Sequence, residues 1–589
     1  MAFQDYSHLT ERRKVERQQK LRKRITIAVV LTTIAIIVIS CGAVAVIYRQ
    51  NQGKGSETHE VGDLKASKTV SHLQKGIKMI CSPTDYKETC ESSLTSIMSS
   101  NTSANPKDLL KAAINVIINE VDKAFNFARL NINDPKIKGA VEDCHVLLKD
   151  AKEELRDSIS HIGNDISKIS SKTTDLNNWL SAVMSYQETC IDGFPEGKLK
   201  TNMQNGMKTA KEMTSNALAI VSEVSTLFSL FPGFTHRHLL SKVPKGASLD
   251  NNGLPHWMSH NDRRMLRAAK VKKLKPNVTV AKDGSGQFTT ISGALAAMPK
   301  EHEERYIIYV KMGIYDETVI VEKKMVNITM YGDGSQKTIV TGSKNFVDGV
   351  RTFQTATFAA LGEGFIAQGM GFRNTAGPEK HQAVALRVQS DRSVFLNCRM
   401  EGYQDTLYAQ THRQFYRSCV IAGTVDFIFG DATTILQNCM IIVRKPLDNQ
   451  QNIVTAQGRI DKRETTGIIL QNCRILPDKK LVPDRLKIRS YLGRPWKEFS
   501  RTIIMESTIS DLIHPDGWLP WEGDFALKTL YYAEYKNRGP GAIQTARIKW
   551  PGYKKEITKV EAMKYTVVPF LQDDWIRASG APAHMGLFR

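Results

Sequence analysis

The chain has 589 residues, a length that predicts two or three domains and excludes a single ordinary one. Its formal net charge of +21 indicates a polyanionic partner. Nucleic acid is the usual partner for such a charge, but no basic-aromatic nucleic-acid motif accompanies it. An acidic polysaccharide fits the charge equally well.

Near the amino end, residues 25–47 carry no charge and are long enough to span a bilayer as a helix. Residues 1–24 are rich in basic side chains towards their end: Arg12, Arg13, Lys14, Arg17, Lys20, Arg22, Lys23 and Arg24. This asymmetry predicts a cytoplasmic tail, a type II signal-anchor at 25–47 and a lumenal remainder. A cleavable signal peptide is the alternative, but its apolar core is normally only about 7–15 residues long.

Cysteines and sequons fit a lumenal or secreted context. Cys41 falls inside the expected span, so we do not expect it to form a disulfide. The other cysteines follow the span, where disulfides can form. Asn-x-Ser/Thr sequons at Asn101, Asn277 and Asn327 predict glycosylation of an exposed surface.

From about residue 71 to 230 the apolar residues recur with a helical period. One amphipathic face is formed by Leu110, Ile114, Ile117, Val121 and Phe125. Gly and Pro are scarce in this region, which predicts an all-α bundle of antiparallel helices. Its four cysteines allow three pairings that the sequence alone leaves open: Cys81, Cys90, Cys144 and Cys190.

The region from about 276 to 575 contains short β-type segments separated by Gly-rich turns. Cys398, Cys419 and Cys439 recur about every 20 residues, each after an Asn or Ser, and Cys473 ends a further copy of the motif. Such a recurrence indicates a solenoid whose coils stack strand on strand. Because no regular helices intervene, we predict a right-handed parallel β-helix.

The same register brings polar residues together. Gln382 and Gln404 are about one coil apart, and so are Asp405 and Asp426. Stacking would place the two carboxyl groups about 4.8 Å apart, the spacing of neighbouring strands. Two carboxyl groups so close cannot both ionise freely, so one can act as an acid and the other as a base or nucleophile.

Five motifs in this region resemble the signature set of plant pectin methylesterases (pectinesterases). They begin at Gly313 (Gly-Ile-Tyr-Asp-Glu), Gln382 (Gln-Ala-Val-Ala-Leu), Gln404 (Gln-Asp-Thr-Leu), Gly423 (Gly-Thr-Val-Asp-Phe-Ile-Phe-Gly) and Leu492 (Leu-Gly-Arg-Pro-Trp). The resemblance runs from about Val278 to Trp575, and the upstream helical region resembles the inhibitor-like pro-region of these enzymes. It implies a carboxylic ester hydrolase that releases methanol from methyl-esterified polygalacturonan, with no cofactor and no metal.

The resemblance also implies catalytic roles. Asp426 is expected to be the nucleophile, and Asp405 the proton donor that later becomes the base. Gln382 and Gln404 carry amide donors suited to an oxyanion hole. Arg494, whose guanidinium stays protonated, is expected to keep Asp426 ionised.

A further set of residues matches the substrate-contacting positions of the family. The aromatic members are expected to stack on sugar faces, although aromatic residues also commonly form protein cores. The expected substrate contacts are Thr352, Gln382, Tyr408, Phe429, Arg494, Trp496 and Trp521.

For the cysteines, the resemblance implies the disulfides Cys81–Cys90, Cys144–Cys190 and Cys419–Cys439. The periodicity alone could not exclude Cys398 as the partner of Cys419, because the two are equally close in register. Under the implied pairing, Cys398 and Cys473 are free, buried thiols.

Residues 231–275 are rich in Pro, Gly, His and basic residues and are expected to form a linker. Within it, Arg263-Arg264-Met265-Leu266 resembles the site at which subtilisin-like proteases release the mature enzyme, and the segment beginning at Arg237 is a weaker second candidate.

The expected division of the chain is therefore a tail at 1–24, an anchor at 25–47, an inhibitor-like pro-domain at 71–230, a linker at 231–275, a catalytic domain at 276–575 and a C-terminal tail at 576–589. The mature enzyme is expected in the cell wall, and the pro-domain is expected either to silence it or to aid its folding and export.

One residue departs from the family pattern. Asp431 stands where the family commonly has Asn. A third carboxylate near Asp405 and Asp426 would raise their pKa values, and this is our expectation for Asp431.

Two other functions remain open at this point. Retaining glycosidases also use two carboxylates about 5 Å apart, so a solenoid of this kind could cut the pectin chain instead of its esters. The paired glutamines favour ester chemistry, which needs an oxyanion hole. The second alternative is a non-catalytic wall-binding protein.

Overall fold

The computed structural model describes residues 63–98, 105–128, 135–162, 169–229, 275–300, 302, 304–572 and 574–588. The described residues from Ser71 onwards form one compact unit. No helix in these described ranges is long and apolar enough to cross a membrane. The predicted anchor with Cys41, the sequon at Asn101 and both candidate cleavage sites lie outside the described residues.

The helical region is a bundle, as predicted. Each of its four long helices packs against two others, α4 and α6 both lying beside α5 and α7. Leu110, Ile114, Ile117 and Val121 are fully buried on α4, and Phe125 packs against the same core. The helices are α2 (Asp63–Cys81), α3 (Lys87–Ile97), α4 (Pro106–Ala128), α5 (Pro135–Ile162), α6 (Ile169–Asp192), α7 (Lys198–Ser222) and α8 (Val224–Ser229).

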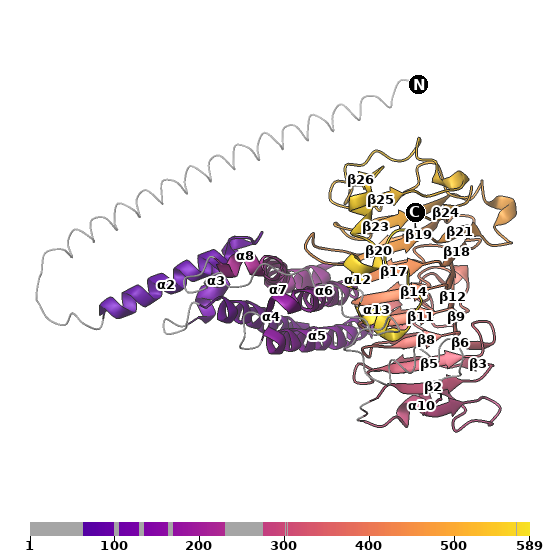
Figure 1. The fold of residues 1–589 in the computed structure, drawn as a ribbon, viewed down its shortest axis with the longest axis horizontal. Helices are drawn as coiled ribbons and strands as arrows, with labels where there is room; N and C mark the ends of the chain where they lie inside the picture. Colours follow the sequence, from indigo (N-terminus) through magenta and orange to yellow (C-terminus); the bar gives the residue numbers. More distant parts are fainter. Residues whose placement is uncertain are drawn as a thin grey trace, which may run out of the picture. The chain divides into compact units, whose positions relative to one another are not determined.

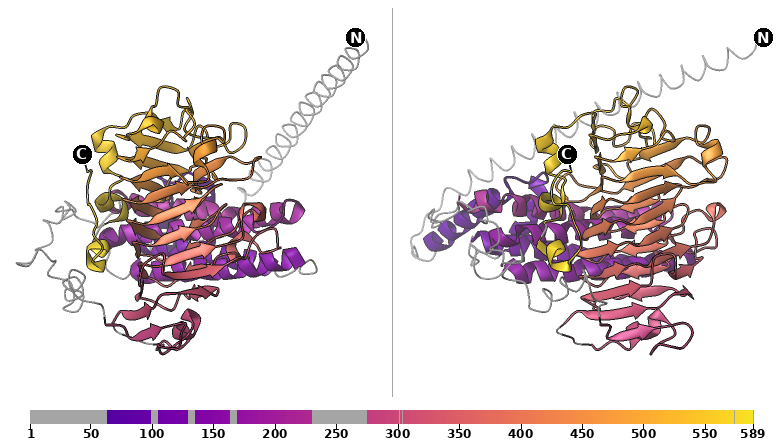
Figure 2. Two further views of the ribbon diagram at one scale, coloured as in Figure 1. Left: turned by 90° about the vertical axis from the view of Figure 1, so that its right-hand side faces the viewer. Right: turned by 45° about the vertical axis from the view of Figure 1, so that its right-hand side comes forward.

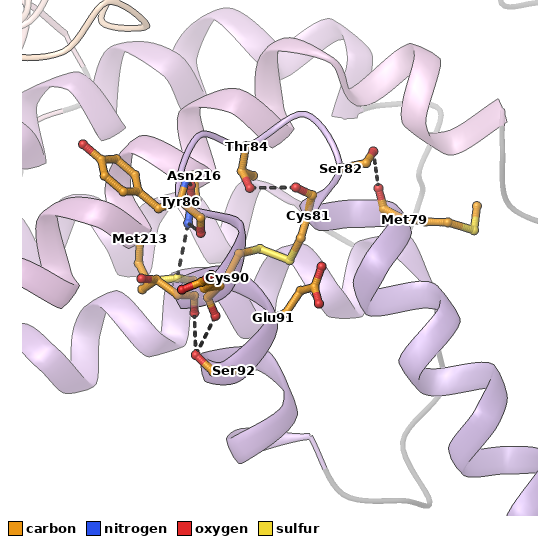
Figure 3. The surroundings of a disulfide bond; sticks show 12 residues. Met79, Cys81, Ser82, Thr84, Tyr86, Cys90, Glu91, Ser92, Met213 and Asn216 are labelled. Atoms are coloured by element: carbon orange, nitrogen blue, oxygen red, sulfur yellow. Dashed lines mark hydrogen bonds between the residues drawn. A yellow bond between two sulfur atoms is a disulfide. The ribbon is translucent and has the colours of Figure 1, made fainter. Parts of the chain in front are cut away.

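Two disulfides join helices of this region. Cys81 at the end of α2 is bonded to Cys90 in α3 (Figure 3), and Cys144 in α5 is bonded to Cys190 in α6. These are the pairings that the family resemblance implies. The turn between Cys81 and Cys90 is also held to α7, because Tyr86 N–H donates to Asn216 Oδ1 over 3.2 Å and Asn216 Nδ2 donates to the Tyr86 carbonyl over 2.9 Å.

The second region is a parallel β-helix. Its strands form three sheets in which each strand pairs in parallel with strands of the neighbouring coils (Figures 1 and 2). The 11-stranded sheet contains β1 (Val278–Val280), β2 (Tyr306–Val310), β5 (Ile328–Gly332), β8 (Ile366–Gln368), β11 (Ser393–Leu396), β14 (Arg413–Arg417), β17 (Thr433–Gln437), β20 (Gly467–Gln471), β23 (Arg501–Met505), β25 (Tyr531–Tyr535) and β26 (Tyr553–Lys554).

The other two sheets complete the coils. The 7-stranded sheet runs β22 (Ser490–Gly493), β19 (Asn452–Gln457), β16 (Ile428–Gly430), β13 (Leu407–Ala409), β10 (Leu386–Val388), β7 (Phe358–Ala360) and β4 (Val319–Val321). The 8-stranded sheet runs β24 (Thr508–Ile509), β21 (Arg474–Pro477), β18 (Met440–Val443), β15 (Val420–Gly423), β12 (Arg399–Glu401), β9 (Gly371–Asn374), β6 (Thr338–Gly342) and β3 (Gly313–Asp316).

Short helices accompany the solenoid: α10 (Ile291–Ala296), α11 (Lys559–Met563), α12 (Val567–Leu571) and α13 (Asp574–Ser579). The end of the chain, expected as a tail, is bound to the 11-stranded sheet. Gln437 Nε2 donates to the His584 carbonyl and Gln471 Nε2 to the Gly586 carbonyl, both over 2.8 Å. These two bonds come from neighbouring strands, β17 and β20, so they hold the chain end across the coils.

Side-chain stacking explains the sequence period. Phe395 and Tyr416 are register partners, and their buried rings stack with centroids 4.9 Å apart. The residues before the four cysteines all have positive φ, a backbone conformation that Asn adopts more readily than most residues: Asn397 (51°), Ser418 (53°), Asn438 (56°) and Asn472 (52°). The repeated Asn-Cys motif is therefore a corner followed by an inward-facing thiol.

The predicted disulfide between Cys419 and Cys439 is wrong. Both are free and buried, as are Cys398 and Cys473, the two predicted thiols. Val420 and Met440 are register partners, so the cysteines before them are stacked one strand spacing apart. That spacing of about 4.8 Å is wider than the Cβ–Cβ distance of about 3.8 Å that a disulfide needs. Cys419 Sγ instead donates to the Phe395 carbonyl over 3.3 Å.

These positions predict a thiol pattern. After unfolding without reductant, alkylation should modify Cys398, Cys419, Cys439 and Cys473, because each is an unpaired thiol in the folded chain. The cysteines of the helical region should stay unmodified until reductant is added. Peptide mass spectrometry identifies which cysteines are alkylated before and after reduction. A non-reduced peptide pair linking Cys419 to Cys439 would contradict the structure.

Candidate functional site

The predicted acid pair lies where two neighbouring coils enter the 7-stranded sheet. Asp405 and Asp426 each stand two residues before paired strand positions, Leu407 on β13 and Ile428 on β16. The Asp405 N–H donates to the Val425 carbonyl over 3.0 Å, which fixes the two corners side by side. The side chains of Asp405 and Asp426 therefore start from equivalent positions one coil apart, as the spacing predicted.

The backbone at both aspartates is left-handed, as it is at other corners of the solenoid. Asp405 has φ 64° and Asp426 has φ 50°, in the left-handed region that costs energy for a residue with a side chain. Both residues are buried, at 7% and 5% exposure. Asn397 and Asn438 have the same conformation, so the two aspartates are buried corner residues of neighbouring coils.

Arg494 follows β22 and reaches Asp426 from two coils away. Its Nε donates to Asp426 Oδ1 over 2.9 Å and its Nη2 to Oδ2 over 2.6 Å, a bidentate pair. The same guanidinium lies over the Trp521 ring, 4.3 Å from its centroid. The predicted partnership of Arg494 with Asp426 is thus present, and Trp521 covers its outer face.

Burial and charge separate the two carboxyl groups. Burial raises the pKa of Asp405 well above its ordinary value, and the charge of Asp426 raises it further while Arg494 opposes. Burial also raises the pKa of Asp426, but there the hydrogen-bonded Arg494 acts against it directly. Asp405 therefore retains its proton more strongly, and Asp426 is the member that ionises first.

The two predicted glutamines lie on the same face of the solenoid. The Ala383 N–H donates to the Gln404 carbonyl over 3.2 Å, so Gln382 is beside the coil that carries Gln404 and Asp405. Both glutamines are half-buried. Their amides can donate hydrogen bonds to an oxygen that becomes negative beside the aspartates.

Aromatic side chains continue the site along the sheet. The Tyr408 and Phe429 rings stack with centroids 4.3 Å apart, and Trp496 meets Phe429 edge-on at 6.0 Å. Thr352 opens a short 3-10 turn (Thr352–Gln354) before β7. Phe353, next to Thr352, joins the same apolar cluster, although no motif in the sequence singled it out.

The helical bundle covers these aromatic residues. Tyr408, Phe429 and Phe353 belong to one apolar cluster with the bundle core, and Trp496 packs against it. Lys497 also binds the bundle, donating to Glu188 Oε1 and Asp192 Oδ1 over 2.8 Å each. The predicted sugar-binding surface is therefore occupied by residues of this same chain.

Asp431 does not act on the acid pair as expected. The charges that shift the pKa of Asp405 are Asp426 and Arg494, and Asp431 is not one of them. Its Oδ1 accepts bonds from Thr466 Oγ1 over 2.5 Å and Gln457 Nε2 over 3.1 Å.

A second buried carboxyl, Glu464, lies beside Asp431. Burial raises the pKa of Asp431 to about 7, and the pKa of Glu464 is raised well above its usual range by burial and by Asp431. Asp431 and Glu464 thus form a separate buried acid pair behind the site.

Family models, sequence relatives and a solved structure all match this chain to pectinesterases. Residues 277–574 match the Pectinesterase family, and residues 75–220 match the Plant invertase/pectin methylesterase inhibitor family. Pectinesterase/pectinesterase inhibitor 45 of Arabidopsis thaliana is 50% identical over 610 residues, with all of both chains covered. Pectinesterase 3 of Phaseolus vulgaris is 42% identical over 544 residues, covering 90% of each chain. The solved pectin methylesterase from carrot is 50% identical with a TM-score of 0.53, covering 54% of this chain and 99% of its own.

The Asp431 geometry predicts a pH effect on stability. A carboxyl whose pKa is raised by folding stabilises the fold at low pH, and that stability is lost as pH rises from about 4 to about 7. Asp431→Asn removes the ionisation and should raise the free energy of unfolding at pH 8 by as much as about 4 kcal/mol, with little effect at pH 4. Melting temperatures measured across this range test it.

Asp484→Asn is the matched control, because Asp484 is a half-buried carboxylate whose pKa is lowered by Lys445. The Asp484→Asn variant should lose stability between pH 4 and 7 as the unmodified chain does. Parallel pH profiles for Asp431→Asn and the unmodified chain would show that Asp431 is not a buried acid.

Proposed function

The chain belongs to the pectinesterase family, and we propose that it demethylates homogalacturonan through nucleophilic attack by Asp426. It is a carboxylic ester hydrolase that converts pectin methyl esters to methanol and free carboxylates. The observation that supports the aspartate mechanism is the stacked pair Asp405 and Asp426 with Arg494 bound to only one member.

In the first half of the reaction, an Asp426 oxygen attacks the ester carbon and the carbonyl oxygen becomes negative. The amides of Gln382 and Gln404 donate to that oxygen. The intermediate then collapses, the bond from carbon to methoxy oxygen breaks, and Asp405 gives its proton to the leaving group, which departs as methanol. An anhydride between the substrate and Asp426 remains.

In the second half, Asp405 is ionised and takes a proton from water, whose oxygen attacks the acyl carbon of the anhydride. The bond to Asp426 breaks, releasing the free carboxylate and the nucleophile. This division of roles follows the order of the pKa values, because Asp405 holds its proton more strongly and Asp426 has the guanidinium of Arg494.

The substrate chain would lie across the 7-stranded sheet. The aromatic residues Tyr408, Phe429, Trp496 and Trp521 contact one another or Arg494 beside the acid pair, and Thr352 lies at the end nearest β7. We extend the proposal to these residues as the sugar-contacting surface. The β-helix is expected to be right-handed, as parallel crossover connections nearly always are.

Glycoside hydrolysis remains the competing chemistry for two stacked carboxyl groups. The position of Gln382 and Gln404 favours ester hydrolysis, since two amide donors beside the acid pair suit an acyl oxyanion.

For the helical region we propose that it silences the enzyme. Access of a polysaccharide requires that Tyr408 and Phe429 be uncovered, and both are buried against the bundle. Release would follow cleavage near Arg263–Leu266, or at the segment beginning at Arg237, by a subtilisin-like protease. Separate inhibitor proteins could then occupy the same surface.

The precursor is proposed to be held in the secretory pathway by residues 25–47. Its glycans would attach at Asn101, Asn277 and Asn327, and its mature part would act in the cell wall. Asn277 and Asn327 are both exposed, as a glycan requires.

The mechanism predicts a loss of activity at either aspartate. Asp426→Asn and Asp405→Asn should each lower methanol release from methylated pectin by at least about 1000-fold, because one removes the nucleophile and the other the acid. Circular dichroism should show an intact fold, and Asp484→Asn, which changes a half-buried carboxylate paired with Lys445, should retain activity. New reducing ends without methanol would identify a glycosidase, and full methanol release by Asp426→Asn would contradict the mechanism.

Silencing predicts that weakening the bundle contact raises activity. Glu188→Lys in the full chain replaces an ion-pair partner of Lys497 with a like charge, so the bundle should bind less tightly. Methanol release should rise by about tenfold. Glu196→Lys is the control, because Glu196 is exposed on the bundle and pairs with Lys200. Equal activity of the two variants would exclude silencing through this contact.

A further inference from the structure

An ion pair is buried inside the last coils of the solenoid. Arg547 donates from Nε to Glu534 Oε1 over 2.8 Å and from Nη2 to Glu534 Oε2 over 3.2 Å, and the two side chains are 2% and 0% exposed. Tyr553 OH also donates to Glu534 Oε1, over 3.0 Å. Replacing a buried ion pair with well-packed apolar residues often leaves a protein as stable or more stable. Stability alone therefore does not account for this pair, and its other contacts indicate what it holds in place.

Both members of the pair bind the segment from Pro515 to Trp518, which follows β24. Arg547 Nη1 donates to the Pro515 carbonyl over 3.0 Å, and Trp518 Nε1 donates to Glu534 Oε1 over 3.3 Å. Gly517 has φ 73°, and a Cβ there would collide with the Arg547 side chain. Only glycine readily combines this backbone conformation with so close a contact, so the segment is fitted around Arg547.

Trp518 connects this segment to β22. It is 1% exposed and forms an isolated parallel bridge with Gly493, the last residue of β22. The Leu492 N–H donates to the Gly517 carbonyl over 2.7 Å, and the Leu519 N–H donates to the Gly493 carbonyl over 3.0 Å. A Cβ at Gly493 would lie only 3.1 Å from the Trp518 ring, so the close approach of the two segments depends on glycine here.

The same segment contacts Arg494, the residue directly after β22. Trp521, three residues after Trp518, lies over the Arg494 guanidinium with its ring centroid 4.3 Å away. On its other side chain contact, that guanidinium donates to both carboxylate oxygens of Asp426. The segment is therefore anchored inside the solenoid by Trp518, and it bears on Arg494 both through the end of β22 and through Trp521.

We propose that Glu534 and Arg547 are positioning residues for ester hydrolysis, because they fix the segment that holds the Arg494 guanidinium on Asp426. The inference rests on the proposed function and adds to it two residues that lie outside the reacting groups. Asp426 must be ionised to attack, and Arg494 acts against the effect of burial on the pKa of Asp426. A looser segment would let the guanidinium leave its bidentate position for part of the time, and the pKa of Asp426 would then rise.

The main test is the double variant Glu534→Gln/Arg547→Met in the full chain. It removes both charges together, so that neither is left unpaired in the core, which is the most destabilising change to a buried pair. The low-pH limb of kcat/KM for methanol release from methylated pectin should move up by about one pH unit, part of the 1–3 units that an adjacent opposite charge contributes. At pH values above that limb, kcat/KM should change far less.

Titration of the same variant by carbon NMR, with aspartate labelled at the carboxyl carbon, should show an equal rise in the pKa of Asp426. This measurement does not depend on turnover. A purely structural role would lower activity equally at every pH, because a smaller fraction of the chains would be folded.

Trp518→Phe is a second variant, and it keeps the proposal testable if the double variant does not fold. It retains an aromatic ring in the core but loses the N–H that donates to Glu534, so the low-pH limb should move in the same direction. The control is Arg485→Met/Asp511→Asn, which removes another bidentate pair of the solenoid, with side chains 32% and 40% exposed. It should leave the low-pH limb in place.

An unmoved low-pH limb together with an unmoved pKa of Asp426 would overturn the inference, and so would an equal shift in the control. Absence of methanol from the unmodified chain at every pH would instead contradict the proposed function. The NMR titration would still decide the inference in that case, so the two failures are distinguishable.

Discussion

Parallel in-register stacking of coils is the constraint on which the site depends. It brings Asp405 and Asp426, which are distant in sequence, to equivalent corners of neighbouring coils. Once there, the two carboxyl groups share a buried setting, and Arg494 contacts only Asp426. The difference in pKa that acid and nucleophile need arises from this asymmetry.

The sequence predicted the features that follow from periodicity. The stacked aspartates, the adjacent glutamines and the bundle with its two disulfides were all accessible, because each depends on spacing or on a motif. The Cys419–Cys439 pairing, which the family resemblance implied, failed because cysteines in stacked register need not lie close enough to form a disulfide. The same limit applies to Asp431, whose position beside the pair in sequence did not reveal that its carboxyl turns to Thr466 and Glu464.

Contacts between the two regions could not be predicted at all. Arg351, Gln354 and Lys497 belong to no motif that links them to Asp143 or Glu188, which are more than two hundred residues away in sequence. Only the folded chain shows that carboxylates of a helical bundle lie on a surface suited to an acidic polysaccharide. This placement explains part of the strongly basic composition, since some of the positive charge lies along the proposed path of the substrate.

The central claim is that Asp405 holds its proton because it is buried and because Asp426 lies one coil away. Titration of the full chain with aspartate labelled at the carboxyl carbon, followed by carbon NMR, measures both groups directly. The account predicts that Asp405 titrates above Asp426, and that Asp426→Asn lowers the pKa of Asp405 by removing a negative neighbour while Arg494 remains. A pKa of Asp405 that is unmoved by this substitution, or that lies below that of Asp426, would contradict the account.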